Sequence, residues 1–196
     1  SVATVCVARP DHRPQRVVSL NLCTDLLLLE IAAPTQIAGL TALARDPALS
    51  PHADAAARLP VTRGQTETLL ALDPDLILAT PQAAIPAVAL LRQLGLRVEL
   101  IAPPSTVEEL RQTLHRTGEL LGQAARAEAL VATLPPAAAP PAGTAWLLQA
   151  GGHTPGEANL GHALLEQAGL RDLASSSAYA RGGFVPLEVL LGARAD

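Results

Sequence analysis

Short apolar runs alternate with helical segments over residues 16–102, and this alternation limits the folds open to the chain. Strands are predicted at residues 16–20, 37–40, 75–79 and 97–102. Helices are predicted at residues 26–33, 66–72 and 85–95, which end at a proline, an Asp-Pro pair or a glycine. Strands that alternate with helices at this spacing indicate βαβ units and a mostly parallel sheet. The sequence therefore predicts an α/β fold.

A long stretch without a strand signal comes next. Ser105 and Glu108 form a capping-box pattern, and apolar residues then recur at helical spacing up to Leu121. After a connector rich in proline and alanine, the pattern predicts a strand at 145–150, with Trp146 in the core, and helices at 159–168 and 186–192. The predicted parts are a tail at 1–15, an α/β lobe at 16–104, bridging helices at 105–134, the connector at 135–143 and a second α/β lobe at 144–196.

An internal repeat links the two predicted lobes. Glu67 precedes Asp75 by eight residues, and Glu188 precedes Asp196 by the same spacing, with a Leu-Leu pair at the same offset in each copy. A predicted strand follows the first copy, whereas the second copy ends the sequence. We therefore expect the second lobe to be incomplete, because a missing strand would leave a sheet edge bare.

The composition narrows the classes of function. A net charge of −4 and a pI near 5.7 argue against a nucleic-acid binder. All basic residues are arginine, which excludes a Walker A lysine and a Schiff-base lysine. Prolines interrupt the longest uncharged stretch, residues 129–156, so no membrane-spanning helix is expected.

No catalytic residue, metal site or cofactor is predicted. The sequence has no Gly-x-Ser-x-Gly motif, and the glycines of residues 151–156 do not match the dinucleotide-binding pattern. The histidines are scattered, whereas a zinc site needs about four ligands at close spacing. Cys6 and Cys23 could form a disulfide or remain free thiols. A fragment of a Rossmann-type enzyme is the alternative to a binding protein.

Ligands of open α/β sheets bind beyond the carboxyl ends of the strands. This rule selects loops that carry the polar residues Asn21, Thr24, Arg45, Arg63 and Gln82 in the first lobe and His153 in the second. Asn21 and Thr24 lie where a helix begins, and a helix N-terminus suits a polar or anionic ligand group. Simple helix capping is the alternative for these two residues, and solvation is the alternative for the arginines.

Seven ordered segments carry a family resemblance. They are residues 16–25 (Arg-Val-Val-Ser-Leu-Asn-Leu-Cys-Thr-Asp), 64–78, 94–98, 118–122, 151–156 (Gly-Gly-His-Thr-Pro-Gly), 168–172 and 182–188 (Gly-Gly-Phe-Val-Pro-Leu-Glu). In this order they resemble the periplasmic substrate-binding proteins of ABC importers for cobalamin, ferric siderophores and haem. The segments are spread in this order over most of the range 16–196.

The resemblance implies two Rossmann-like lobes with parallel sheets, bridged by a long helix, with the ligand in the cleft between them. It implies a monomeric periplasmic protein that captures a corrinoid or a ferric siderophore without chemistry. By family position it adds Tyr179 and Arg181 to the ligand contacts, and arginines suit ligand carboxylates. It also implies that Glu67 and Glu188, one on each lobe, dock on arginines of an ABC permease in the inner membrane. The 2% aromatic content weighs against haem but does not separate corrinoid from siderophore.

Overall fold

The computed structural model describes residues 13–62, 65–81, 85–134, 140 and 142–192. The chain divides into two compact units. The N-terminal unit holds Ser1–Pro103 and Thr113–Ala132, and the C-terminal unit holds Pro104–Gln112 and Thr133–Asp196.

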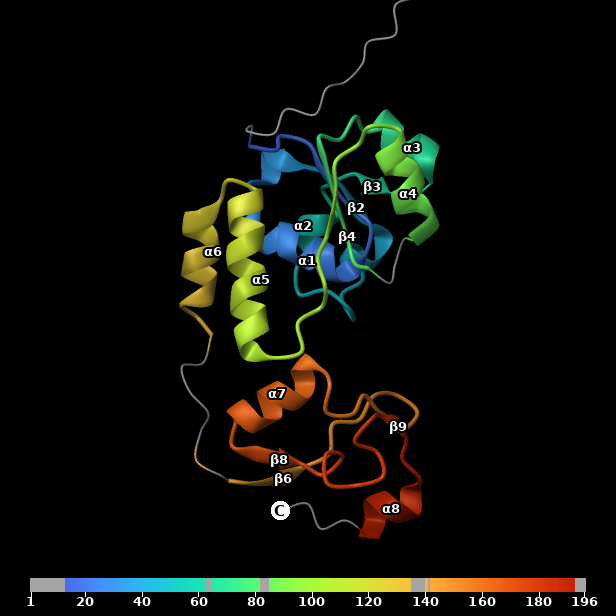
Figure 1. Ribbon diagram of the computed structural model, residues 1–196, viewed down its shortest axis with the longest axis vertical. Helices are drawn as coiled ribbons and strands as arrows, with labels where there is room; N and C mark the ends of the chain where they lie inside the picture. The colour runs from blue at the N-terminus through green and yellow to red at the C-terminus, as the bar shows by residue number, and fades with distance from the viewer. Residues whose placement is uncertain (1–12, 63–64, 82–84, 135–139, 141, 193–196) are drawn as a thin grey trace, which may run out of the picture. The chain divides into compact units, whose positions relative to one another are not determined.

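A five-stranded sheet forms the centre of the N-terminal unit (Figure 1). Its strands are β1 (Val17–Ser19), β2 (Ile37–Thr41), β3 (Val61–Thr62), β4 (Leu76–Ala79) and β5 (Val98–Leu100). Their order is β3-β2-β1-β4-β5, and all four pairings are parallel. The predicted α/β fold with a parallel sheet is therefore confirmed. The sequence pattern missed only β3 here, because two residues give no readable alternation.

Helices cover both faces of this sheet (Figure 1). They are α1 (Leu22–Ile31), α2 (Ala53–Ala56), α3 (Thr66–Ala71), α4 (Ile85–Gln93) and the 3₁₀ turns η1 (Pro34–Gln36) and η2 (Ala42–Arg45). The fully buried Leu28 and Ile31 of α1 pack on one face. On the other face, Leu69 of α3 and Leu91 of α4 form a cluster with Val18 and Ile77 of the central strands. Burial on both faces explains why β1 and β4 are continuous apolar runs.

Residues 105–134 contain no strand, as predicted, and hold two helices separated by a turn at residues 121–123. The helices are α5 (Val107–Leu120) and α6 (Ala124–Val131), which lie side by side in Figure 1. Gly122, with a φ of +63°, makes the turn between them. Gly118 lies so close to Ala127 that a Cβ on it would overlap the alanine methyl group, which lets the two helices approach closely.

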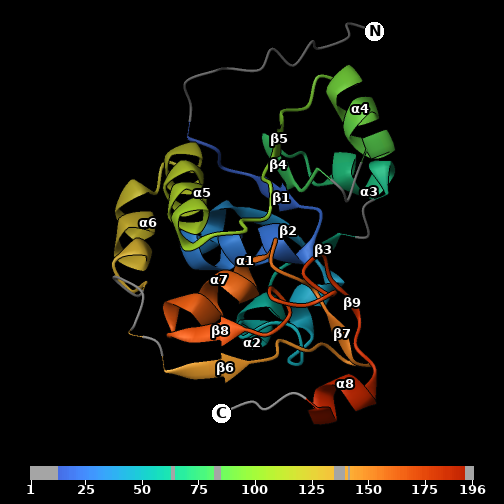
Figure 2. The ribbon, with the colours of Figure 1, turned by 60° about the horizontal axis from the view of Figure 1, so that its bottom comes forward.

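The C-terminal unit includes residues 107–112 at the start of α5, and its described residues from 142 to 192 form two small sheets and two helices (Figure 2). Strands β6 (Gly143–Ala145) and β8 (Leu170–Asp172) pair in parallel, and β7 (His153–Thr154) and β9 (Gly183–Phe184) pair antiparallel. Helix α7 (Leu160–Gln167) packs against β8, and α8 (Leu187–Gly192) follows β9. The prediction that Trp146 lies mid-strand in the core is wrong. The ladder with β8 ends at Ala145, and Trp146 is only half-buried in the irregular segment that follows.

Candidate functional site

The strand order places a topological switch point between β1 and β4. From β1 the chain moves outward through β2 to β3, and it then returns to the other side of β1 with β4. In open parallel sheets, the crevice beyond the carboxyl ends of two such strands is the usual place for a ligand. Asn21 and Thr80 are the polar residues that lie just beyond β1 and β4 here.

Asn21 connects the two strand ends at this switch point. Its side-chain oxygen accepts a hydrogen bond from the Thr24 N–H at 3.1 Å, which caps α1. This cap explains why α1 begins at Leu22, four residues before the predicted start. Its Nδ2 donates to Thr80 Oγ1 at 3.4 Å. The predicted contact Asn21 thus caps the helix and also lies, half-buried, at the edge where a ligand is expected.

Thr24 forms hydrogen bonds with both the side chain and the backbone of Asn21. The residue is fully buried, its hydroxyl shares a 2.7 Å hydrogen bond with the Ser19 hydroxyl, and it also donates to the Asn21 carbonyl at 3.1 Å. The structure therefore gives Thr24 the role of shaping the loop that carries Asn21.

Asp25, which the sequence analysis did not select, connects this loop to the end of β2. Its Oδ1 accepts the Thr41 N–H at 3.0 Å, and its Oδ2 accepts the Thr41 hydroxyl at 2.5 Å. The carboxyl group is fully buried, and desolvation raises its pKa above the ordinary value. Hydrogen bonds from Thr41 and Ser19 lower the pKa, but by less than desolvation raises it. Its place in the first turn of α1 was the one sequence signal that could have identified it.

Arg45 ends η2 and is held by the polypeptide around α2. Its Nε donates to the Ala56 carbonyl at 3.3 Å, and its Nη2 donates to the Leu59 carbonyl at 2.6 Å. The guanidinium therefore fixes the loop after β2 at its far end. The other two predicted contacts of this lobe, Arg63 and Gln82, lie outside the described residues.

In the C-terminal unit, the loops that carry the remaining predicted contacts lie against each other. His153 is exposed on β7, and β7 pairs with β9, which begins two residues after Arg181. Gly156 and Gly182 have positive φ angles, and the Glu157 N–H donates to the Ala180 carbonyl at 2.8 Å. The loop of His153 and the loop of Tyr179 and Arg181 are thereby joined through their backbones.

Tyr179 packs edge-on against Trp146, with ring centroids 6.2 Å apart and an interplanar angle of 67°. The Nε1 atom of Trp146 is buried and finds no hydrogen-bond partner among the described residues. The sequence placed Trp146 in a strand and so missed this aromatic pair. Both residues are half-buried, and they lie on segments that follow the carboxyl ends of β6 and β8.

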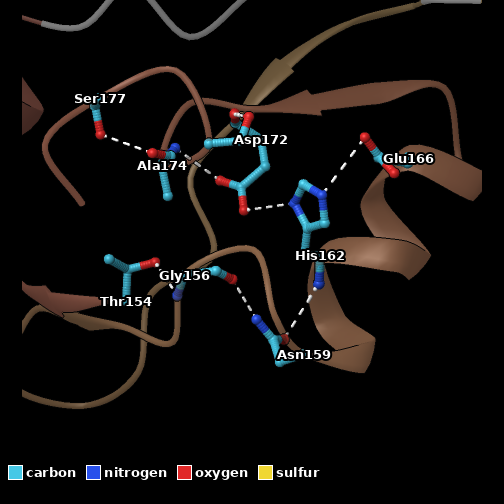
Figure 3. Close-up of polar contacts among 9 residues, drawn as sticks. Thr154, Gly156, Asn159, His162, Glu166, Asp172, Ala174 and Ser177 are labelled. Carbon is cyan, nitrogen blue, oxygen red and sulfur yellow. Dashed lines mark hydrogen bonds and ion pairs between the residues drawn. The ribbon is translucent and has the colours of Figure 1, made fainter. Parts of the chain in front are cut away.

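A second polar network, also missed by the sequence analysis, supports these loops (Figure 3). His162 Nδ1 lies 3.1 Å from Asp172 Oδ2, and its Nε2 lies 3.5 Å from Glu166 Oε1. The buried Asp172 also accepts the Ala174 N–H at 2.9 Å. Asn159 caps α7 by accepting the His162 N–H at 3.2 Å, and it donates to the Gly156 carbonyl. The network fastens α7 to the end of β8.

Glu67 and Glu188 occupy equivalent positions. Each is the second residue of a six-residue helix, α3 or α8, and each is exposed. Within the described ranges, no group of three or more histidine, cysteine or acidic side chains is arranged to hold a metal ion. A search of the same residues finds no helix long and apolar enough to cross a membrane.

The chain matches the model of one protein family, and it is similar in structure to several solved proteins. The family model described as periplasmic binding protein matches residues 17–187. No curated protein sequence matches the chain. A possible iron-binding, periplasmic solute-binding protein from Staphylococcus epidermidis ATCC 12228 is similar in structure, with a TM-score of 0.71 and 16% identity, over 92% of this chain and 74% of that one.

Two further solved structures share the fold. The periplasmic vitamin B12 binding protein of Vibrio cholerae has a TM-score of 0.64 and 17% identity, over 92% of this chain and 73% of that one. A periplasmic heme binding protein from Pseudomonas aeruginosa has a TM-score of 0.65 and 24% identity, over 91% of this chain and 68% of that one.

Proposed function

The chain belongs to the periplasmic binding protein family, and from this premise we propose that it is the solute-binding component of an ABC importer for a corrinoid or a ferric siderophore. The family consists of binding proteins, so the chain is a solute-binding protein and not an enzyme. Family membership also indicates an extracytoplasmic location, and the periplasm is the compartment proposed here. A monomer is the proposed state.

The polar edge at the switch point is the observation that carries this function. Asn21 and Thr80 bring a side-chain amide and a hydroxyl together beyond the ends of β1 and β4, where open sheets bind ligands. Neutral hydrogen-bonding groups of this kind suit the amide and hydroxamate oxygens of corrinoid side chains and siderophores. The structural neighbours named for vitamin B12, iron and heme support the choice of a large chelate as ligand.

The proposed contacts come from both units. Asn21, Thr24, Arg45, Arg63 and Gln82 are the N-terminal set, and His153, Tyr179 and Arg181 are the C-terminal set. Within these sets, Asn21 and Tyr179 supply direct hydrogen-bonding or stacking groups, whereas Thr24 and Arg45 act through the loop conformations that they hold. Arg63, Arg181 and His153 would donate hydrogen bonds to anionic groups of the ligand.

Glu67 and Glu188 are the proposed contacts with an ABC permease in the inner membrane. Each carboxylate is exposed in the first turn of its helix. Each is followed three residues later by an exposed leucine, Leu70 at 45% and Leu191 at 78% exposure. Residues three apart share a helix face, so each helix presents an acidic group beside an apolar one. Such a surface suits a partner that offers arginine side chains with apolar neighbours.

Binding can be tested with three probes: cyanocobalamin, ferrichrome and haemin. The single tryptophan, Trp146, lies beside the proposed contact Tyr179, so its fluorescence reports on the C-terminal loops. We expect saturable quenching and a raised melting temperature with cyanocobalamin or ferrichrome. A matched titration of Asn21→Ala should show weaker binding. If neither the fluorescence nor the melting temperature responds to any of the three probes, the proposed function is wrong.

A further inference from the structure

We propose that Asp25 is a positioning residue for ligand capture, whose buried carboxylate holds the loop after β2 against the start of α1. The inference rests on the proposed function, because it concerns the affinity of the site at the carboxyl edge of the sheet. It assigns a role to a residue that was not among the predicted contacts.

The geometry couples two segments that are separated in the sequence. Both oxygens of Asp25 are occupied by Thr41, one by its N–H and one by its hydroxyl. Thr41 is the last residue of β2 and the N-cap residue of η2, the turn that ends at Arg45. The carboxylate therefore fixes the point at which the chain leaves the sheet and enters that turn.

The hydroxyl of Thr41 is used for this contact instead of for local capping. A threonine at an N-cap position commonly accepts a hydrogen bond from a backbone N–H of its own helix. No such side-chain cap is formed at η2, and the Thr41 hydroxyl donates to Asp25. The Thr41 hydroxyl thus connects the two loops and does not cap η2.

Burying the Asp25 carboxylate costs desolvation free energy, so its presence here is not explained by a gain in stability. Desolvation disfavours its charged form and raises its pKa. Transferring a carboxylate from water to a buried site costs free energy, and its hydrogen bonds offset that cost only in part. A carboxylate kept at this place is therefore consistent with a requirement for the loop arrangement that it imposes.

The arrangement extends to the proposed contacts. Asn21 precedes Asp25 by one helical turn, and it reaches Thr80 beyond β4. The hydrogen bond between the Ser19 and Thr24 hydroxyls also holds the loop that carries Asn21. With Asp25 on Thr41, side-chain hydrogen bonds connect the carboxyl ends of β4, β1 and β2. Asp25 supplies this contact at the first turn of α1, whereas His52 Nε2, further along the segment after β2, lies 2.6 Å from Glu30 Oε1 near the end of α1.

The test compares three variants with the wild type. Asp25→Asn keeps the size of the side chain but turns an NH2 group toward one of the two Thr41 donors. Thr41→Val removes the hydroxyl and keeps the N–H, and Thr41→Ser keeps both donors and serves as the matched control. Affinity for cyanocobalamin, ferrichrome and haemin is measured by Trp146 fluorescence, together with the melting temperature and amide hydrogen exchange at residues 41–46.

We expect Asp25→Asn to weaken the binding of the active probe by at least about tenfold, with faster exchange at 41–46, when affinity is measured well below the melting temperatures of both proteins. Thr41→Val should weaken binding by a smaller factor, and Thr41→Ser should bind like the wild type. Equal affinities of the wild type, Asp25→Asn and Thr41→Val would overturn this inference and leave the proposed function standing. A fall in affinity that merely follows a fall in melting temperature would also overturn it. If the wild type binds no probe, the proposed function fails and this inference fails with it.

Discussion

The side-chain amide of Gln36 donates a hydrogen bond to the backbone carbonyl of Leu121 at 3.0 Å, across 85 positions of sequence. The same NH2 group donates to the Pro14 carbonyl, and the amide oxygen accepts from the Ala33 N–H and from Gln123 Nε2. Gln36 is almost completely buried. One side chain therefore ties the start of β2 to the turn between α5 and α6.

Replacing Gln36 by alanine should reduce the free energy of unfolding by about 3 kcal/mol, because several buried polar groups lose their partner at once. Urea unfolding followed by far-ultraviolet circular dichroism measures the change. The matched control is Gln112→Ala, since Gln112 is exposed and only donates to Glu108 within the same helix, and it should change the free energy by less than about 0.5 kcal/mol. Equal effects of the two substitutions would contradict the assignment of Gln36 as a connecting residue.

Two glycines with positive φ provide a matched test of the C-terminal loops. At Gly151, φ is +81° and a Cβ would meet nothing within 4 Å, so Gly151→Ala should cost about 1 kcal/mol through backbone strain alone. At Gly156, φ is +78° and a Cβ would overlap backbone atoms of Ala180, Arg181 and Gly182. Gly156→Ala should therefore cost about 3 kcal/mol or more. Urea unfolding monitored by Trp146 fluorescence compares them, and equal costs would show that the close approach is absent.

The sequence predicted the elements whose structure depends on residues close together in the chain. The apolar runs of β1 and β4 depend on neighbours in the sequence, and they were found. Capping by Asn21 stood only as the alternative to a ligand contact, and the start of α1 was predicted four residues too late. The polar networks were missed because their partners lie far apart in the chain. Asp25 meets Thr41 sixteen positions away, and His162 meets Asp172 ten positions away. A rule that looks for several metal ligands at close spacing cannot detect a histidine whose partner is an aspartate at the end of a strand.

The buried Asp25 carboxyl should make stability depend on pH. Its pKa is raised in the folded state above the ordinary value of 3.8, so the folded protein binds this proton more tightly than the unfolded chain does. The resulting stabilisation is complete below that ordinary value and is lost as the pH rises through the folded pKa. Asparagine cannot titrate. The free energy of unfolding of the wild type, minus that of Asp25→Asn, should therefore increase as the pH is lowered from 7 to about 4. Urea unfolding at a series of pH values tests this, and a difference that stays constant or decreases toward acid would contradict it.

Reversing the charge at both Glu67 and Glu188 should abolish binding to the permease and leave the ligand affinity unchanged. Each carboxylate is exposed, and an exposed ion pair contributes about 1 kcal/mol or less by itself. Two repulsive contacts within one complex act together, because the first contact no longer raises the local concentration of the second. The variant Glu67→Arg with Glu188→Arg is therefore expected to fail in a pull-down with the permease in lipid nanodiscs, whereas either single reversal should retain partial binding.

The control for that experiment reverses two other exposed acids, Asp54 of α2 and Glu119 of α5, which changes the net charge by the same amount. This control should bind the permease like the wild type, since neither residue lies on α3 or α8. If the control and the double variant lose binding equally, long-range charge and not docking at these helices explains the loss. If the double variant also loses its affinity for the ligand, Glu67 and Glu188 belong to the ligand site instead of the permease surface.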